Sequence, residues 1–297
     1  MIFVVGLRNL IYQIFISRHA VKENLNIALP AEGNNLSWAD LFNRSSVLGT
    51  KWGQLPVDVF TLHNRWNYEE TMALMGPSVN TFTIVRNPVE HFESVYVYTG
   101  LEELYGVDLK NFTKGLQKNA ADANLQKGYG YFGRNLIAFD LGINISEADS
   151  EPHVIYERIK ELDNQFKLVM ITERMDESLV LLADLLCWPL ERVVYLKLNV
   201  RKPEKNIDLT EDEGNTLSRW LNVDSLIYSY FKKRFDGRVA DFNARNKPNW
   251  MNEQVRQLQD LNYKLKERCV IEQVGNEKLS GKFKETSNNI MGYFVHQ

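Results

Sequence analysis

Residues 81–98 read TFTIVRNPVEHFESVYVY and carry the strongest signal of the fold class. Thr81–Val85 alternates threonine with apolar residues and is rich in β-branched side chains, which favours a buried strand. The strand ends at Arg86, and the pattern of Val89–Tyr98 then has helical periodicity. A strand that passes directly into a helix is the repeating unit of α/β proteins.

The helix has a well-marked start. Asn87 is a favoured N-cap residue, and Pro88 suits the first helical position, where its missing N–H costs nothing. Glu90 stands three residues after the cap and predicts an arrangement like a capping box. These signals place Arg86 at the carboxyl end of a strand, immediately before a helix.

On both sides of this stretch, short apolar runs alternate with helical patterns along the chain. Further predicted strands are Met1–Val5, Val57–Leu62, Lys167–Ile171 and Val193–Leu198. Further predicted helices start near Asn9 and span Val154–Phe166, Asp176–Cys187, Glu211–Phe235 with a break near Asn222, and Trp250–Gln273. This order predicts an α/β fold with a central parallel sheet flanked by helices, and the lack of repeats or linkers favours one domain over residues 1–297. The last helix is amphipathic and predicts a core-covering role or, alternatively, an oligomer interface.

Composition limits the function classes. The 297 residues are 44% hydrophobic and 25% charged, which is ordinary for a globular fold. A net charge of −3 excludes a strongly basic nucleic-acid binder, so any site for a phosphorylated ligand must be local. The two cysteines, Cys187 and Cys269, lack the paired spacing of a zinc site, and no metal is predicted. They can form one disulfide or remain two unpaired thiols.

Arg86 is a candidate phosphate ligand. Open α/β sheets bind ligands at the carboxyl ends of their strands, where Arg86 is predicted to lie. A guanidinium offers a planar fork of donors that suits phosphate, and Ser94, two turns into the helix, adds a hydroxyl. The alternative is structural: an arginine at a strand edge and a serine on a solvated helix face.

Three longer blocks carry a resemblance to a known family. Arg-Asn-Pro with a serine eight positions after the arginine is similar to the 3′-phosphate motif of sulfotransferases that use 3′-phosphoadenosine 5′-phosphosulfate (PAPS). Gly133–Gly142 (GRNLIAFDLG), Phe166–Trp188 and Asn222–Phe231 (NVDSLIYSYF) resemble blocks of the galactose-3-O-sulfotransferases. The resemblance runs in order from about Asn24 to Cys269. It implies a PAPS-sulfotransferase fold related to P-loop nucleotide kinases, and sulfuryl transfer to the 3-hydroxyl of a terminal β-galactose on a glycolipid or glycoprotein glycan.

The resemblance also implies roles for single residues. His63, in LHNRWNYEE, becomes the base that takes the proton of the galactose 3-hydroxyl, and Arg65 lies near the acceptor or the sulfuryl oxygens. By itself, a histidine at a strand end is more often structural. His91, in the same region of the sequence, is interpreted as a helix-surface residue.

The cofactor side is assigned in the same way. Arg86 and Ser94 bind the 3′-phosphate, and Arg134 and Asn135 of the Gly133–Gly142 block are further cofactor-binding candidates. Residues 127–134 (KGYGYFGR) predict either a lid or sugar-stacking loop, or simply a mobile surface loop.

The sequence departs from the family at one place. The family's loop for the 5′-phosphosulfate is rich in Lys, Ser and Thr, whereas the corresponding Phe3–Ile11 reads FVVGLRNLI. Only Gly6 and Arg8 remain as candidate contacts, so we expect little or no turnover. Three explanations stay open: an incomplete sequence whose upstream part carries the loop and a membrane anchor, a pseudoenzyme that retains a glycan cleft, or a shifted site in which Arg8 acts.

The resemblance implies a membrane-anchored enzyme of the Golgi lumen, although we expect none of the segments in this sequence to be an anchor. Met1–Ile16 is apolar but too short and too polar to span a bilayer. Four Asn-x-Ser/Thr sequons are weak evidence for secretory passage. They begin at Asn35, Asn43, Asn111 and Asn144. The alternative function is a non-catalytic glycan-binding relative.

Overall fold

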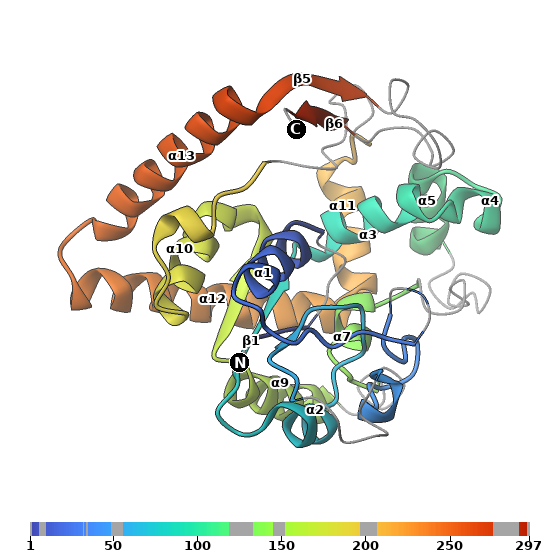
Figure 1. Cartoon of the computed structure of the whole chain (residues 1–297). Helices are drawn as coiled ribbons and strands as arrows, with labels where there is room; N and C mark the ends of the chain where they lie inside the picture. The colour runs from blue at the N-terminus through green and yellow to red at the C-terminus, as the bar shows by residue number, and fades with distance from the viewer. Residues whose placement is uncertain are drawn as a thin grey trace.

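The structure is a computed structural model that describes residues 2–5, 10–31, 33, 35–48, 56–118, 133–144, 152–196, 207–275 and 291–295. Its centre is a parallel four-stranded sheet in the order β2-β1-β3-β4 (Figure 1). The strands are β1 (Ile2–Val5), β2 (Val59–Phe60), β3 (Asn80–Val85) and β4 (Leu168–Ile171). The predicted mixed α/β class with a parallel sheet is confirmed, although the sheet is small and the described residues are mostly helical.

The register brings the carboxyl ends of three strands together. Val5 of β1 lies beside Thr83 of β3, and Val85 at the end of β3 lies beside Ile171 at the end of β4. β3 is central, and its residues 81–85 are all buried. A parallel strand covered on both faces carries a nearly continuous run of apolar and β-branched residues, which explains the sequence TFTIV.

Helices surround this sheet (Figure 1). They are α1 (Leu10–Lys22), α2 (Tyr68–Met75), α3 (Pro88–Tyr98), α4 (Leu101–Tyr105), α5 (Leu109–Lys118), α7 (Leu136–Asp140), α9 (Pro152–Gln165), α10 (Met175–Leu185), α11 (Glu211–Trp220), α12 (Asn222–Arg245) and α13 (Trp250–Cys269). Short 3₁₀ turns are η1 (Arg44–Ser46), η3 (Thr172–Arg174) and η4 (Leu190–Arg192). An antiparallel pair, β5 (Val270–Gly275) and β6 (Met291–Val295), follows α13.

Three predicted elements need correction. The strand expected over Val57–Leu62 covers only Val59–Phe60. The strand expected over Val193–Leu198 is wrong for its described part, residues 193–196, because the backbone N–H of Tyr195 donates to the side chain of Asn262 on α13. The last helix ends at Cys269, and the chain continues as β5. The break expected near Asn222 is confirmed, since α11 and α12 meet there.

The buried side chains form two clusters. The larger one surrounds the sheet and includes Met251 and Leu258 of α13, as expected for a core-covering helix. The smaller one lies among α3, α4, α5 and α11 and contains Phe92, Tyr96 and Phe112. Both cysteines are free thiols, so the alternative of a disulfide is wrong.

Candidate active site

The turn after β3 is held by two acidic side chains. The side chain of Asn87 accepts hydrogen bonds from the N–H groups of Val89 and Glu90, so the predicted N-cap is confirmed. The capping box is wrong in its second half. The backbone N–H of Asn87 donates to Glu173 Oε1 at 2.8 Å, while the Glu90 carboxylate pairs with Arg86.

Arg86 is only loosely held. Its Nη2 lies 3.4 Å from Glu90 Oε2, and the two side chains are 34% and 52% exposed. An exposed pair one helical turn apart contributes only about 0.3–0.5 kcal/mol, so an incoming phosphate can displace the carboxylate. Ser94 is half-buried two turns along α3, on the same strand–helix unit. The assignment of Arg86 and Ser94 to a phosphate stays a prediction.

His63 follows β2, and residues 35–41 run parallel to the backbone of residues 63–65. Asn35 pairs with His63 and Leu41 with Arg65, and the carbonyl of His63 accepts from the N–H of Leu36 at 2.7 Å. The His63 side chain is half-buried. A partly exposed imidazole on a backbone fixed by the neighbouring segment is compatible with a base, and its predicted role remains untested.

Arg65 makes structural contacts. Its Nε donates to the carbonyl of Phe139 at 2.9 Å, and Nη1 donates to the carbonyl of Ala39 at 3.2 Å. Its guanidinium carbon lies 3.7 Å from the centre of the Phe139 ring. Contacts of this kind fix the side chain and favour a role in holding the site together. The prediction that Arg65 lies near the acceptor stays a prediction.

Arg134 and Asn135 bind the junction of α11 and α12. Arg134 Nε donates to the carbonyl of Trp220 at 2.6 Å, and its Nη2 donates to Asn222 Oδ1 at 2.9 Å. Asn135 is fully buried, and its Oδ1 accepts from the N–H of Asp224 at 3.2 Å. These contacts attach the Gly133–Gly142 block to α12. Binding of a cofactor by the same two residues is untested.

Two predicted features fall outside the described residues. Gly6 and Arg8 belong to residues 6–9, which are not described. Of the predicted lid at residues 127–134, only Gly133 and Arg134 are described. β1 and α1 flank residues 6–9, so the strand and the helix expected around the phosphosulfate loop are both confirmed.

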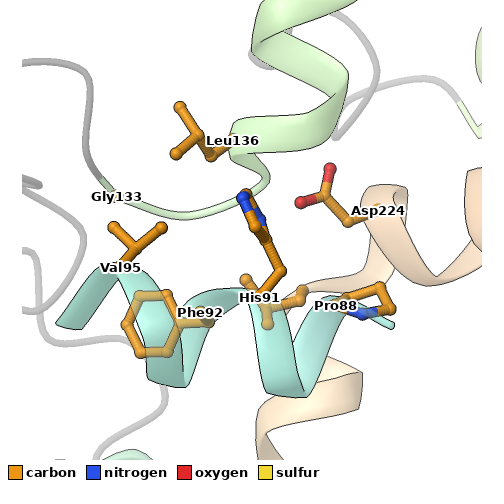
Figure 2. Close-up of a pocket in the computed structure, with 8 residues that line it drawn as sticks. Pro88, His91, Phe92, Val95, Gly133, Leu136 and Asp224 are labelled. Atoms are coloured by element: carbon orange, nitrogen blue, oxygen red, sulfur yellow. The ribbon is translucent and has the colours of Figure 1, made fainter. Parts of the chain in front are cut away.

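The structure adds two residues that sequence reasoning missed or misassigned. His91 is half-buried and lines a pocket together with Asp224, so its interpretation as a helix-surface residue is wrong. Figure 2 shows the imidazole of His91 extending from α3 toward Leu136 and Asp224. The pocket is lined by Pro88, His91, Phe92, Val95, Gly133, Leu136, Leu221 and Asp224. The sequence signal was the aspartate of the block NVDSLIYSYF.

Asp224 is a buried acid in an unusual electrostatic environment. It is 2% exposed, and its two oxygens accept the backbone N–H groups of Ile137 and Ala138. Burial raises the pKa of Asp224 from 3.8 to about 7. The two N–H donors and Arg134 oppose this rise, whereas nearby Asp140 adds to it.

Comparison with known proteins decides the family. The family model described as galactose-3-O-sulfotransferase matches residues 7–293. The chain belongs to the galactose-3-O-sulfotransferase family. The galactosylceramide sulfotransferases of Bos taurus and Homo sapiens are each 31% identical to it, over 257 and 258 residues. Galactose-3-O-sulfotransferase 2 of Sus scrofa is 30% identical over 261 residues.

These alignments cover 85% of the chain but only 59% of the galactosylceramide sulfotransferases and 64% of the Sus scrofa galactose-3-O-sulfotransferase 2. The chain thus spans about three fifths of the length of the relatives it matches. Among the residues that the structure describes, no helix is both long and apolar enough to span a bilayer. Within the same ranges, no three His, Cys, Asp or Glu side chains gather as a metal site.

Proposed function

We propose that this galactose-3-O-sulfotransferase family member transfers a sulfuryl group from PAPS to the 3-hydroxyl of a terminal β-galactose. The acceptor is a glycolipid, such as galactosylceramide, or a glycoprotein glycan. The observation that carries the proposal is the family match over residues 7–293, with galactosylceramide sulfotransferases 31% identical. The arrangement of the β3–α3 unit at the carboxyl edge of a parallel sheet supports it.

In this proposal, different residues bind the sulfate donor and activate the acceptor. Arg86 and Ser94 bind the 3′-phosphate, and among the described residues the ion pair of this guanidinium is with the exposed carboxylate of Glu90. His63 takes the proton of the acceptor hydroxyl as that oxygen forms its bond to sulfur. The bond between sulfur and the bridging oxygen breaks, and adenosine 3′,5′-bisphosphate leaves. Arg65 stabilises the segment around His63 through its contacts with Phe139.

The leaving-group side fits less well. Residues 3–11 contain one cation, Arg8, and no lysine, serine or threonine. Loss of one preorganised electrostatic contact commonly lowers a rate about 100- to 1000-fold. We therefore infer that this chain, as it stands, still binds the nucleotide and the acceptor but catalyses little transfer between them. The alternative function, glycan binding without catalysis, rests on the same departure.

A transfer assay separates the two functions. Radiolabelled PAPS is incubated with galactosylceramide or N-acetyllactosamine, and the position of sulfate on the product is determined by NMR. We expect low turnover from the unaltered chain and clear 3-O-sulfation after residues 1–11 are replaced by a family-like strand and Lys/Ser/Thr loop. His63→Ala in the restored protein should abolish turnover again. Failure of the restored protein to transfer sulfate would favour the glycan-binding alternative.

We also propose that the protein works in the Golgi lumen, as the resemblance to membrane-anchored Golgi enzymes implies. All four sequon asparagines are exposed, which supports a chain built for a glycosylating compartment. The chain is expressed in animal cells behind a cleavable secretory leader and treated with an N-glycosidase. A downward shift in mass would support the proposal, and an unglycosylated secreted chain would contradict it.

A further inference from the structure

One short helix connects the two halves of the proposed site. The C-terminal end of α7 binds the segment around His63. The carbonyl of Phe139 accepts from Arg65, and the carbonyl of Asp140 accepts from the N–H of Trp66 at 2.8 Å. The carboxylate of Asp140 also accepts from the indole N–H of Trp38 at 2.9 Å. Any movement of α7 along its axis would therefore shift the backbone next to His63.

The N-terminal end of α7 is held by Asp224. Its Oδ1 accepts from the N–H of Ala138 at 2.8 Å, and its Oδ2 accepts from the N–H of Ile137 at 3.1 Å. In return, the N–H of Asp224 donates to Asn135 Oδ1. The first N–H groups of a helix have no partner within the helix, so this carboxylate satisfies two of them at once. The reciprocal bonds attach α7 firmly to the first turn of α12.

Asp224 also faces the helix that follows Arg86. Figure 2 shows its carboxylate beside His91, which α3 contributes to the same pocket. The charged groups near it are Asp140 on α7 and Arg134 before α7, and the titratable side chain of His91 on α3 lines the same pocket. Asp224 thus lies between the proposed phosphate-binding helix and the short helix that fixes the His63 segment.

We propose that Asp224 is a positioning residue for the galactose acceptor, acting through α7 on the backbone around His63. The identity of the ligand, galactose, rests on the proposed function. The link from Asp224 through α7 to Trp66 rests on the hydrogen bonds of the structure. Asp224 touches neither substrate in this account. Asp224 fixes the position of α7, and α7 in turn fixes the positions of Arg65 and Trp66.

The test compares Asp224→Asn with the unaltered 297-residue chain. The amide has the size of the carboxyl but replaces one acceptor by a donor, so only one of the two N–H groups of α7 stays bonded. Methyl β-galactoside affinity is measured by NMR titration, and adenosine 3′,5′-bisphosphate affinity by calorimetry. We expect the galactoside affinity to fall about tenfold, the cost of a lost buried hydrogen bond, with the bisphosphate affinity changed less than about twofold.

A matched control is Asp176→Asn. Asp176 accepts from two neutral donors, Tyr195 Oη and Gln259 Nε2, on elements away from α7. The control should leave both affinities unchanged. Equal galactoside affinity in Asp224→Asn and the unaltered chain would overturn the proposal. A parallel loss of both affinities would also overturn it, because that result indicates a purely structural residue.

Hydrogen exchange gives a readout that does not depend on either ligand. In Asp224→Asn we expect faster exchange at Ile137, Ala138 and Trp66, with β4 still protected. Faster exchange at Ile137 and Ala138 alone would show that the effect stops within α7, and would overturn the coupling. If the unaltered chain binds neither ligand, the proposed function fails while this exchange experiment still decides the inference.

A second variant covers the case in which Asp224→Asn does not fold. Trp38→Phe keeps a ring but removes the bond from the indole N–H to Asp140 at the other end of α7. We expect the same selective loss of galactoside affinity and the same faster exchange at Trp66. Unchanged affinity and exchange in Trp38→Phe would contradict the role of α7.

Discussion

Gly142 lies so close to the backbone of Trp66 that it has no room for a side chain. It lies just after α7 with a φ of +78°, and a Cβ atom placed on it would stand 2.2 Å from the carbonyl oxygen of Trp66. Real Cβ atoms do not approach a carbonyl so closely, and the carbonyl belongs to backbone that cannot swing away. Gly142→Ala should therefore push α7 and the His63 segment apart.

The cost can be worked out from two contributions. A left-handed conformation costs a residue with a Cβ about 1–2 kcal/mol, and overpacking of a well-packed region costs about 1–3 kcal/mol. Together they predict a loss of about 2–5 kcal/mol in the free energy of unfolding. For a chain of this size, that loss lowers the melting temperature by about 3–8 °C.

Calorimetric unfolding measures the effect, with Gly237→Ala as the matched control. Gly237 lies in the exposed interior of α12, and a Cβ atom added to it would have nothing within 4 Å. Alanine there should stabilise the protein by up to about 1 kcal/mol, because glycine is a poor helix former. If Gly142→Ala melts within about 1 °C of the unaltered protein, the close approach to Trp66 is wrong.

Two further predictions concern the helix start and the buried acid. Asn87→Ala removes the acceptor of two N–H groups at the start of α3, and should lower the free energy of unfolding by about 1 kcal/mol in urea titrations; an unchanged midpoint would contradict the cap. The raised pKa of Asp224, from 3.8 to about 7, means that folding favours its protonated form. That contribution to stability is complete below the unfolded pKa and is lost as the pH rises through 7. The unaltered protein should therefore lose about 3 kcal/mol more than Asp224→Asn between about pH 5 and pH 8. Parallel pH profiles of the two proteins would show that Asp224 does not titrate in this way.

The sequence predicts best where its signals are local. β3, the N-cap at Asn87 and the start of α3 depend on residues within a few positions of one another, and all three are confirmed. The break between α11 and α12 is likewise visible in the pattern of the chain.

Partners that are distant in the sequence could not be predicted in this way. The carboxylate of Glu173, 86 residues away in the sequence, accepts the hydrogen bond from the N–H of Asn87, whereas the local pattern favoured Glu90 as the acceptor. Asn262 binds the N–H of Tyr195 from 67 residues away, and this contact replaces the expected strand pairing. Asp224 reaches α7 from 86 and 87 residues away. Such contacts arise from packing of whole elements, and no nearby residue signals them.

The central claim is that Arg86, at the end of β3, binds the 3′-phosphate of the sulfate donor. The decisive measurement is calorimetric titration of adenosine 3′,5′-bisphosphate into the unaltered chain, Arg86→Ala and Arg158→Ala. Arg158 is the matched control, because it also forms a local ion pair on an exposed helix, with Glu161 of α9. Loss of a charge-assisted contact should weaken binding by about 2 kcal/mol, or about 30-fold, in Arg86→Ala alone. Equal affinity in all three proteins would contradict the account.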